Sequence, residues 1–109
     1  MQAALLIALL AAPAAEAQAI APVRQAELVR MVRQDCGSCH GMRLTGGLGP
    51  ALTREALADK LVPAMAATII HGRPGTPMPG WRAMLSEPEA QWIAEQLAAG
   101  FPEERRGAR

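Results

Sequence analysis

Cys36-Gly37-Ser38-Cys39-His40 is the stretch of this 109-residue chain that most restricts its fold. Cys-x-x-Cys-His is the attachment signature of c-type haem. In that chemistry the two thiols add across the two vinyl groups on one side of the porphyrin, and the adjacent histidine is then placed under the ring to bind iron. The motif therefore predicts one covalently bound haem c, with Cys36 and Cys39 as attachment points and His40 as an iron ligand.

Three other kinds of site use closely spaced cysteines. A thioredoxin-type redox pair needs a strand before the motif and βαβ units around it, and the sequence has no strand pattern. A structural disulfide between these cysteines would stabilise little, because the loop that it closes is tiny. A zinc site needs four protein ligands, and only His71 remains as a further histidine. Haem attachment is the interpretation that the sequence favours.

Met78 is the residue best suited to be the second iron ligand. It lies in Thr76–Pro79, a Thr-Pro-Met-Pro segment that cannot be a helix face and whose rigid prolines would hold the side chain outward. Ligation by His and Met raises the reduction potential and suits electron transfer. A methionine more often fills a gap in a core. The alternatives are His71, which lies at a predicted helix end, and an open sixth position.

The segments on either side of the motif differ in character. Upstream, Leu28, Val29 and Val32 fall on one face of a helix predicted over Arg24–Asp35, which runs directly into the motif. Downstream, residues 41–50 are rich in glycine and predict a loop.

Three more helices are predicted towards the C-terminus. The first runs from Thr53, as N-cap, to Leu61, and the second begins at Pro63 and stops at His71-Gly72. The last is the best marked, because Ser86 and Glu89 form a capping box and Gly100 ends the pattern. Its apolar face consists of Ala90, Ile93, Ala94 and Leu97. The predicted fold is all-α, with about four short helices.

Composition restricts the class of function. About half of the residues are apolar, but with one Phe and no Tyr the core has few large side chains. A core this small is marginal without a cofactor or staple, and a buried porphyrin would supply the missing bulk. The net charge of +1 gives no basic footprint for nucleic acid. No nucleophile–base pair, carboxylate dyad or phosphate loop is evident, so a binding module is predicted and not an enzyme.

Residues 1–19 are predicted to be a secretory signal peptide. The apolar run Ala3–Ala12 is too short to cross a bilayer, which needs about 20 apolar residues, and two Ala-x-Ala cleavage sites follow it. No Lys or Arg precedes this run, so an uncleaved anchor and a first core helix are the alternatives. We expect a haem domain over residues 20–101, a charged tail over residues 102–109, and no stable membrane insertion after cleavage.

From about Val23 to Phe101 the chain resembles the class I cytochromes c. Gly49-Pro50 after the motif and Met78-Pro79 before the last helix match the pattern of that family. The resemblance implies that the Pro50 carbonyl accepts a hydrogen bond from His40, which would orient the ligand. It also implies the class I cytochrome c fold, with the helices wrapped around one covalent haem. The C-terminal helix would then cross the N-terminal helix, with Trp92 or Ile93 at the contact.

The segments 35–50 and 70–81 are similar to the NirC family, the small cytochromes of c-55X type associated with cytochrome cd nitrite reductase. This resemblance implies a periplasmic one-electron carrier of denitrification, with that reductase as the redox partner. A role in maturation of the d-type haem of the reductase is the alternative. A third possibility is a five-coordinate haem that binds gas or reduces peroxide.

Two further expectations concern the surroundings of the haem. Trp81 and Arg73 flank the ligand loop and carry donors suited to a haem propionate. The alternatives are that Trp81 only shields the haem edge and that Arg73 is solvated. A docking face poor in lysine is expected beside the motif, made of Gly37, Met42 and Leu48 with Arg43.

Overall fold

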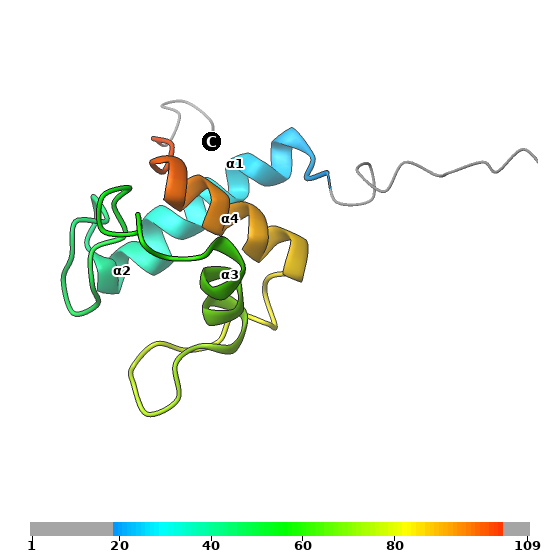
Figure 1. Ribbon diagram of the computed structural model, residues 1–109. Coiled ribbons are helices and arrows are strands. Elements are labelled where there is room, and N and C mark those ends of the chain that lie inside the picture. Colours follow the sequence, from blue (N-terminus) through cyan, green and yellow to red (C-terminus); the bar gives the residue numbers. More distant parts are fainter. Residues whose placement is uncertain (1–18, 104–109) are drawn as a thin grey trace, which may run out of the picture.

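A helical rod that ends at the haem motif is the first element of the structure, a computed structural model that describes residues 19–103 (Figure 1). It consists of α1 (Pro22–Met31), a π-helical turn η2 (Val32–Cys36) and α2 (Gly37–His40), in direct succession. Pro22 stands at the start of α1, where its missing N–H costs nothing. The predicted helix is confirmed, and it extends further than expected, through the motif itself.

The π turn keeps one face of the rod in register from end to end. Leu28, Val32, Cys36 and His40 follow one another at intervals of four residues. In an α-helix each residue advances about 100°, so residues four apart drift by about 40° per step. The wider π turn advances less per residue and offsets much of this drift. Accordingly Leu28, Val32 and His40 are buried, and Cys36 is half-buried.

Residues 41–61 form an irregular segment. The glycine-rich loop is present as predicted, but the expected helix over Thr53–Leu61 is wrong, because this stretch forms isolated turns. Thr53 Oγ1 does accept from the backbone N–H of Ala56 at 3.2 Å, as a cap would. Only Leu57 is buried in the stretch, so little apolar burial offsets the cost of nucleating so short a helix.

Two helices complete the fold. α3 (Val62–His71) has Pro63 in its first turn and ends at Gly72, whose φ of 68° is unfavourable for other residues. α4 (Glu87–Ala99) starts with the predicted capping box, in which Ser86 Oγ accepts from Glu89 N and Glu89 Oε1 accepts from Ser86 N. α4 ends at Gly100, as expected, and no strand occurs among residues 19–103.

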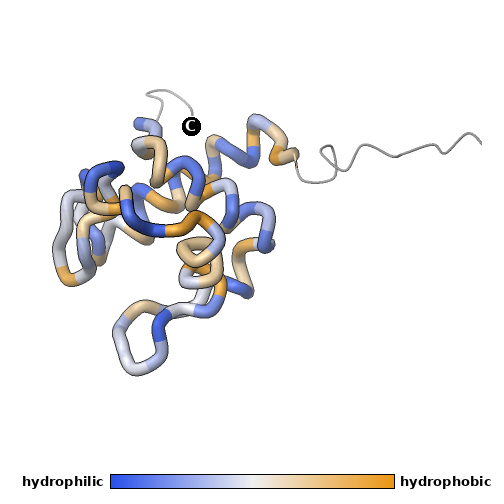
Figure 2. Tube along the Cα trace, viewed as in Figure 1, coloured by the Kyte–Doolittle hydropathy of each residue, from blue (hydrophilic) through white to orange (hydrophobic). Residues whose placement is uncertain are grey.

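The core lies between the rod, α3 and α4. Figure 1 shows α4 crossing the rod, and in Figure 2 apolar stretches lie near the centre of the view. Ile93 is 2% exposed and joins Leu28 in the buried cluster, whereas Trp92 packs only at its margin. Ile93 is thus the more central of the two residues expected at the helix crossing. The core cluster consists of Leu28, Val32, Leu44, Leu57, Ala66, Ile69, Ile70, Leu85, Ala90, Ile93, Ala94 and Leu97.

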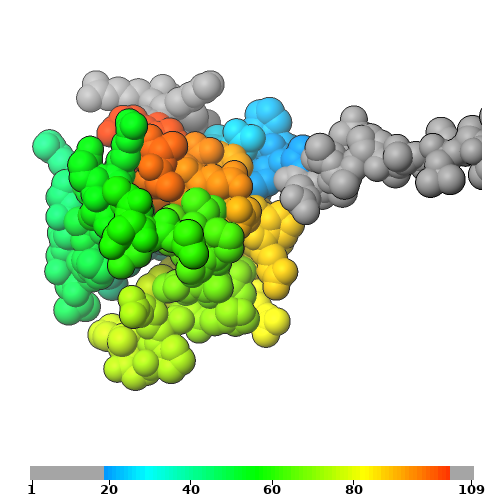
Figure 3. Space-filling model, viewed as in Figure 1, coloured from blue at the N-terminus to red at the C-terminus, as the bar shows by residue number. Residues whose placement is uncertain are grey.

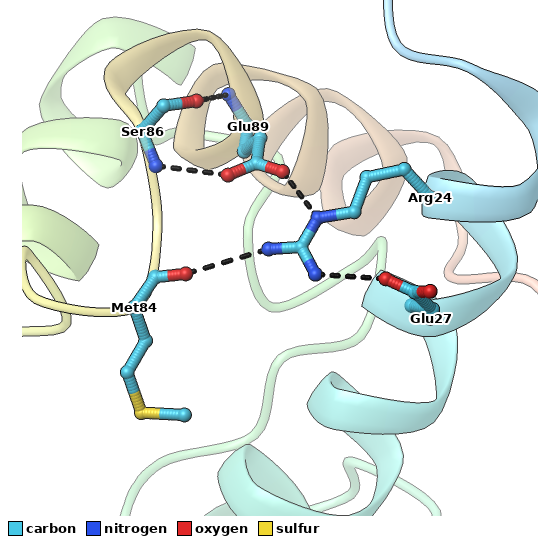
Figure 4. A network of polar contacts seen from close by, with 5 residues as sticks. All are labelled: Arg24, Glu27, Met84, Ser86 and Glu89. Carbon is cyan, nitrogen blue, oxygen red and sulfur yellow. Dashed lines mark hydrogen bonds and ion pairs between the residues drawn. The ribbon is translucent and has the colours of Figure 1, made fainter.

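Two arginines of the rod hold the C-terminal part of the chain. Arg24 donates to Glu89 through Nε at 2.5 Å, to Glu27 at 3.0 Å and to the carbonyl oxygen of Met84 at 3.4 Å (Figure 4). Arg33 donates to the carbonyl oxygens of Phe101 and Pro102 at 3.0 and 2.9 Å. The start of α4 and the segment that follows it are therefore both anchored to the rod.

The expected leader and tail fall largely beyond the described part of the chain. Of the leader, residues 1–19, only Ala19 is described, and of the tail, residues 102–109, only Pro102 and Glu103 are. None of the helices within residues 19–103 has the length and apolar character needed to cross a membrane.

Candidate haem site

His40 is the most constrained polar side chain of the site. It is 9% exposed, and its Nδ1 lies 2.6 Å from the carbonyl oxygen of Pro50, the contact that was expected from the Gly-Pro pair. A carbonyl oxygen only accepts, so Nδ1–H is the donor and Nε2 carries the free lone pair. This is the arrangement in which a histidine is oriented and made ready to bind a metal.

Gly49 lies against the ring of His40. A Cβ at residue 49 would stand 2.8 Å from Nδ1 and from Cε1 of the imidazole, closer than side-chain contacts occur. The loop is folded back onto the motif by Gly49 N–H, which donates to the carbonyl oxygen of Cys39 at 2.8 Å, and by Gly46 N–H, which donates to that of His40 at 2.8 Å. The glycine-rich composition of this loop signalled the turn, but sequence reasoning missed the contact of Gly49 with the ring of His40.

Cys36 and Cys39 are both half-buried and unpaired with each other. Burial, and secondarily the neighbouring Asp35 carboxylate, raise the pKa of the Cys36 thiol to about 11. A redox-active Cys-x-x-Cys pair needs a thiol with a lowered pKa. The environment of Cys36 therefore disfavours the thioredoxin-type alternative. The zinc alternative is also unsupported, because no cluster of three or more His, Cys, Asp or Glu suited to a metal occurs within residues 19–103.

Met78 is half-buried in the loop between α3 and α4. The loop is pinned by Arg73 N–H, which donates to the Met78 carbonyl oxygen at 3.2 Å, and by Met78 N–H, which donates to Thr76 Oγ1 at 3.4 Å. Figure 3 shows a notch on this face between the region of residues 40–50 and the loop of residues 72–80. His71, the rival ligand, is exposed and lines a separate groove of about 220 Å³ with Glu87 and Gln91.

The residues named for the outer parts of the site lie as follows. Trp81 is half-buried against the core and Arg73 is exposed. Met42 and Leu48 are 85% and 77% exposed beside the motif. Gly37, in contrast, is buried, so its expected place on an exposed docking face is wrong. Gly37 opens α2, and a Cβ there would lie 3.6 Å from Met42 Cα and 3.7 Å from the carbonyl oxygen of Val32.

The residues present fit a c-type haem in their chemistry. Covalent attachment requires two free thiols, and Cys36 and Cys39 supply them. Ligation by His and Met requires an imidazole with one nitrogen available and a thioether, which His40 and the separate loop of Met78 supply. Gly49 leaves the imidazole room that any side chain would fill. A groove of about 900 Å³ beside the motif is lined by Gly37, Ser38, Met42 and Arg43, but not by the two cysteines, His40 or Met78, so it has no part in this fit.

Comparisons with known proteins agree with this chemistry. The sequence pattern of the family described as "Cytochrome C oxidase, cbb3-type, subunit III" matches residues 23–96. Cytochrome c55X of Stutzerimonas stutzeri is 56% identical over 96 residues, which cover 88% of this chain and 79% of that protein. A solved structure of "c-type cytochrome NirC" is 52% identical with a TM-score of 0.72, covering 73% of this chain and 94% of that one.

A second solved structure contains a similar domain within a larger protein. It is named "Dihydro-heme d1 dehydrogenase NirN in complex with DHE", and it is 34% identical with a TM-score of 0.61. The match covers 71% of this chain and 17% of that chain. The fold of residues 19–103 is thus found both as a small separate cytochrome and as a minor part of a larger protein.

Proposed function

The chain belongs to the cytochrome c55X (NirC) family of c-type cytochromes, which are electron carriers and not enzymes, and from this premise we propose that it carries single electrons on one covalently attached haem c to cytochrome cd nitrite reductase. The observation that carries the proposal is the buried His40, held through Nδ1 by Pro50 directly after two unpaired cysteines. The haem supplies the redox chemistry, and the chain supplies attachment, ligation and a docking surface.

We assign Cys36 and Cys39 as the attachment residues and His40 and Met78 as the iron ligands. The hydrogen bond to Pro50 leaves Nε2 of His40 free to bind, and the loop bonds of Met78 hold its backbone in a defined position. A thioether ligand raises the reduction potential relative to a second histidine, which suits an electron carrier.

Pro50 and Trp81 complete the assigned haem-binding residues. Pro50 acts on the iron through His40, because a strong acceptor on Nδ1 raises the basicity of the ligand. Trp81 is half-buried next to the ligand loop, and its indole N–H is suited to donate to a haem propionate, with exposed Arg73 as a second donor.

Stopped-flow mixing of the reduced holoprotein with oxidised cytochrome cd nitrite reductase tests the function. We expect the cytochrome to be oxidised in a concentration-dependent phase fast enough to support turnover. Before mixing, acid-acetone extraction and mass spectrometry must find a single haem retained on the polypeptide. Haem released into the extract would contradict the attachment, and a cytochrome that stays reduced would contradict the proposed partner.

A second function is favoured by the similarity to a domain of dihydro-heme d1 dehydrogenase. In this alternative the chain exchanges electrons in the maturation of the d-type haem of the reductase. Mixing the oxidised holoprotein with such a dehydrogenase and its substrate distinguishes the two functions. Reduction of this cytochrome there, without oxidation by the nitrite reductase, would favour maturation.

We also propose that a signal peptide within residues 1–19 is removed on export to the periplasm, by cleavage after Ala17 or after Ala19. N-terminal sequencing of the protein recovered from a periplasmic extract should start at Gln18 or Ile20, after one of the two Ala-x-Ala sites. Recovery of the intact N-terminus in the membrane fraction would instead favour an anchor.

A further inference from the structure

The loop that carries Met78 returns to the helix from which it departs. After α3 ends at His71, the chain makes the loop of residues 72–80, and Trp81 N–H then donates to the carbonyl oxygen of Ile69 at 2.9 Å. The last carbonyls of an α-helix lack partners within the helix. The returning chain supplies one of these partners, so the end of the loop is bonded to the last turn of α3.

Backbone touches backbone at the base of this loop. A Cβ on Gly80 would stand 2.6 Å from the carbonyl oxygen of Ile70 and 2.9 Å from the carbonyl carbon of His71. A Cβ on Gly72 would stand 2.6 Å from the nitrogen of Gly80 and 2.7 Å from the carbonyl oxygen of Met78. The groups approached are main-chain atoms, which cannot rotate away as the end of a side chain can.

We propose that Gly80 is a positioning residue for the iron ligand Met78. Because it has no side chain, the returning chain lies directly on the last turn of α3, and this contact sets the position of the Met78 sulfur. The inference rests on the proposed ligation by Met78. Pro77 and Pro79 flank Met78 and restrict the backbone, so a shift at Gly80 reaches the ligand and is not absorbed on the way.

Gly80 offers a cleaner test of this contact than the other glycines of the loop. Gly72 and Gly75 have φ angles of 68° and 78°, so any substitution there also strains the backbone. Gly80 has no such φ, and a methyl group at Gly80 tests the close approach alone. A Cβ on Gly75 would meet no atom within 4 Å, so Gly75 reports on strain without contact.

The experiment compares the holoproteins of Gly80→Ala, Gly75→Ala and Met78→Ala. The readouts are the weak far-red absorption band of methionine-ligated iron, the reduction potential and the affinity for imidazole. In Gly80→Ala we expect a weakened band, a lower potential and imidazole affinity raised by about tenfold or more, because the displaced thioether competes less for the iron. In Gly75→Ala all three should stay close to those of the wild type.

The outcomes separate the inference from its premise. If Met78→Ala keeps the band, the ligand assignment is wrong. If Met78→Ala loses the band while Gly80→Ala keeps the wild-type band and imidazole affinity, the positioning role of Gly80 is wrong. If Gly80→Ala yields no holoprotein, Gly72→Ala tests the same backbone contact, because a Cβ on Gly72 would stand 2.6 Å from the nitrogen of Gly80. Gly75→Ala is then the control, because Gly75 has a similar positive φ but no atom near its Cβ. Equal imidazole affinities in that pair would likewise overturn the inference.

Discussion

His40 owes its fixed position to two neighbours that act in different ways. Pro50 holds the ring through a hydrogen bond, and Gly49 holds it by leaving only enough space for it. The hydrogen bond was predictable, because a Gly-Pro pair after the motif is a recognisable pattern in the sequence. The contact of Gly49 was not, because it depends on the path by which the loop folds back over the ring.

Gly49→Ala should lower the yield of holoprotein sharply. The new methyl group would lie 2.8 Å from the imidazole, so either the ring turns or the loop moves, and both disturb the proposed ligand. The yield is measured as the ratio of bound haem to polypeptide. Gly37→Ala is the matched control, because the nearest atom to its Cβ lies at 3.6 Å. Equal yields for the two variants would mean that the His40 contact is unimportant.

Met78→Ala and His71→Ala distinguish the two candidates for the second ligand. Loss of the thioether should lower the reduction potential and let CO or imidazole bind, because axial ligands control both properties. His71→Ala should leave the visible spectrum nearly unchanged, since His71 is exposed and lines a separate groove. Optical titration with imidazole measures the difference. If the two variants behave the other way round, His71 is the ligand.

At the scale of elements, the rod α1–η2–α2 shows where hydrophobic periodicity was sufficient and where it was not. Leu28 and Val32 predicted the helix and its buried face. The π turn escaped prediction, although the repeat of four residues through Cys36 to His40 was a usable signal. In the stretch from residue 53 to residue 61 the predicted capping hydrogen bond of Thr53 is present, but the predicted helix is not, because the stretch buries too little apolar surface.

Deletion of Gln34 tests the role of the π turn. Gln34 is exposed within η2, and removal of one residue converts a π turn into a regular α-helical turn. A π turn takes one residue more than an α-helical turn, so the shortened rod should keep the motif close to its present orientation and lose little covalent haem attachment. Deletion of the exposed Ala26 from α1, where no wide turn absorbs the change, should instead rotate the motif by about 100° and lower attachment several-fold. Mass spectrometry gives the haem occupancy, and equal occupancy in the two deletion variants would show that the π turn does not absorb the lost residue.

The contact between Arg24 and Glu89 makes the anchoring of α4 dependent on pH. The hydrogen bond from Arg24 is the largest cause that lowers the pKa of Glu89, followed in the same direction by the backbone N–H of Ser86. A carboxyl whose pKa is lowered by folding stabilises the protein above its unfolded pKa, near 4.3 for Glu, and loses that effect as the pH falls through the folded pKa.

Glu89→Gln should therefore lose stability at neutral pH and show a shallower loss in acid. We expect about 1 kcal/mol at pH 7, because a cap and a partly exposed ion pair are weakened together. Denaturant unfolding of the wild type and the variant at pH 7 and pH 3 measures this. Glu55→Gln, at an exposed site in the turn segment, is the control. A difference between wild type and Glu89→Gln that is the same at both pH values would contradict the linkage.

At the scale of the whole molecule, composition predicted a core with few large side chains, and the distribution of buried side chains agrees. The buried cluster consists of aliphatic side chains alone, while Trp81, Trp92 and Phe101 pack only against its margin. The all-α class and the packing of the last helix followed from local patterns. The return of the loop of residues 72–80 onto α3 did not, because it is formed by backbone contacts between segments that the sequence leaves unmarked.

The surface beside the motif should bind a redox partner mainly through apolar contact. Met42 and Leu48 are the most exposed large hydrophobic residues of the described chain, and Arg43 next to them is exposed as well. With a single lysine and a net charge of +1, the chain has no ring of positive charge to steer an acidic partner. Redox encounters bury little area, so a small apolar patch suffices for a short-lived complex.

The rate of electron transfer to the reductase should therefore change little with salt, by less than about threefold between low and high ionic strength, because screening acts on charges and not on apolar contact. Met42→Asp should slow the second-order phase in stopped flow, since it puts a charge that must be desolvated into the contact. Val23→Asp is the matched control, because Val23 is 71% exposed against 85% for Met42 and lies at the start of α1, away from the motif. A rate that falls many-fold with salt, or that falls equally in both variants, would mean that long-range charge and not this patch directs the encounter.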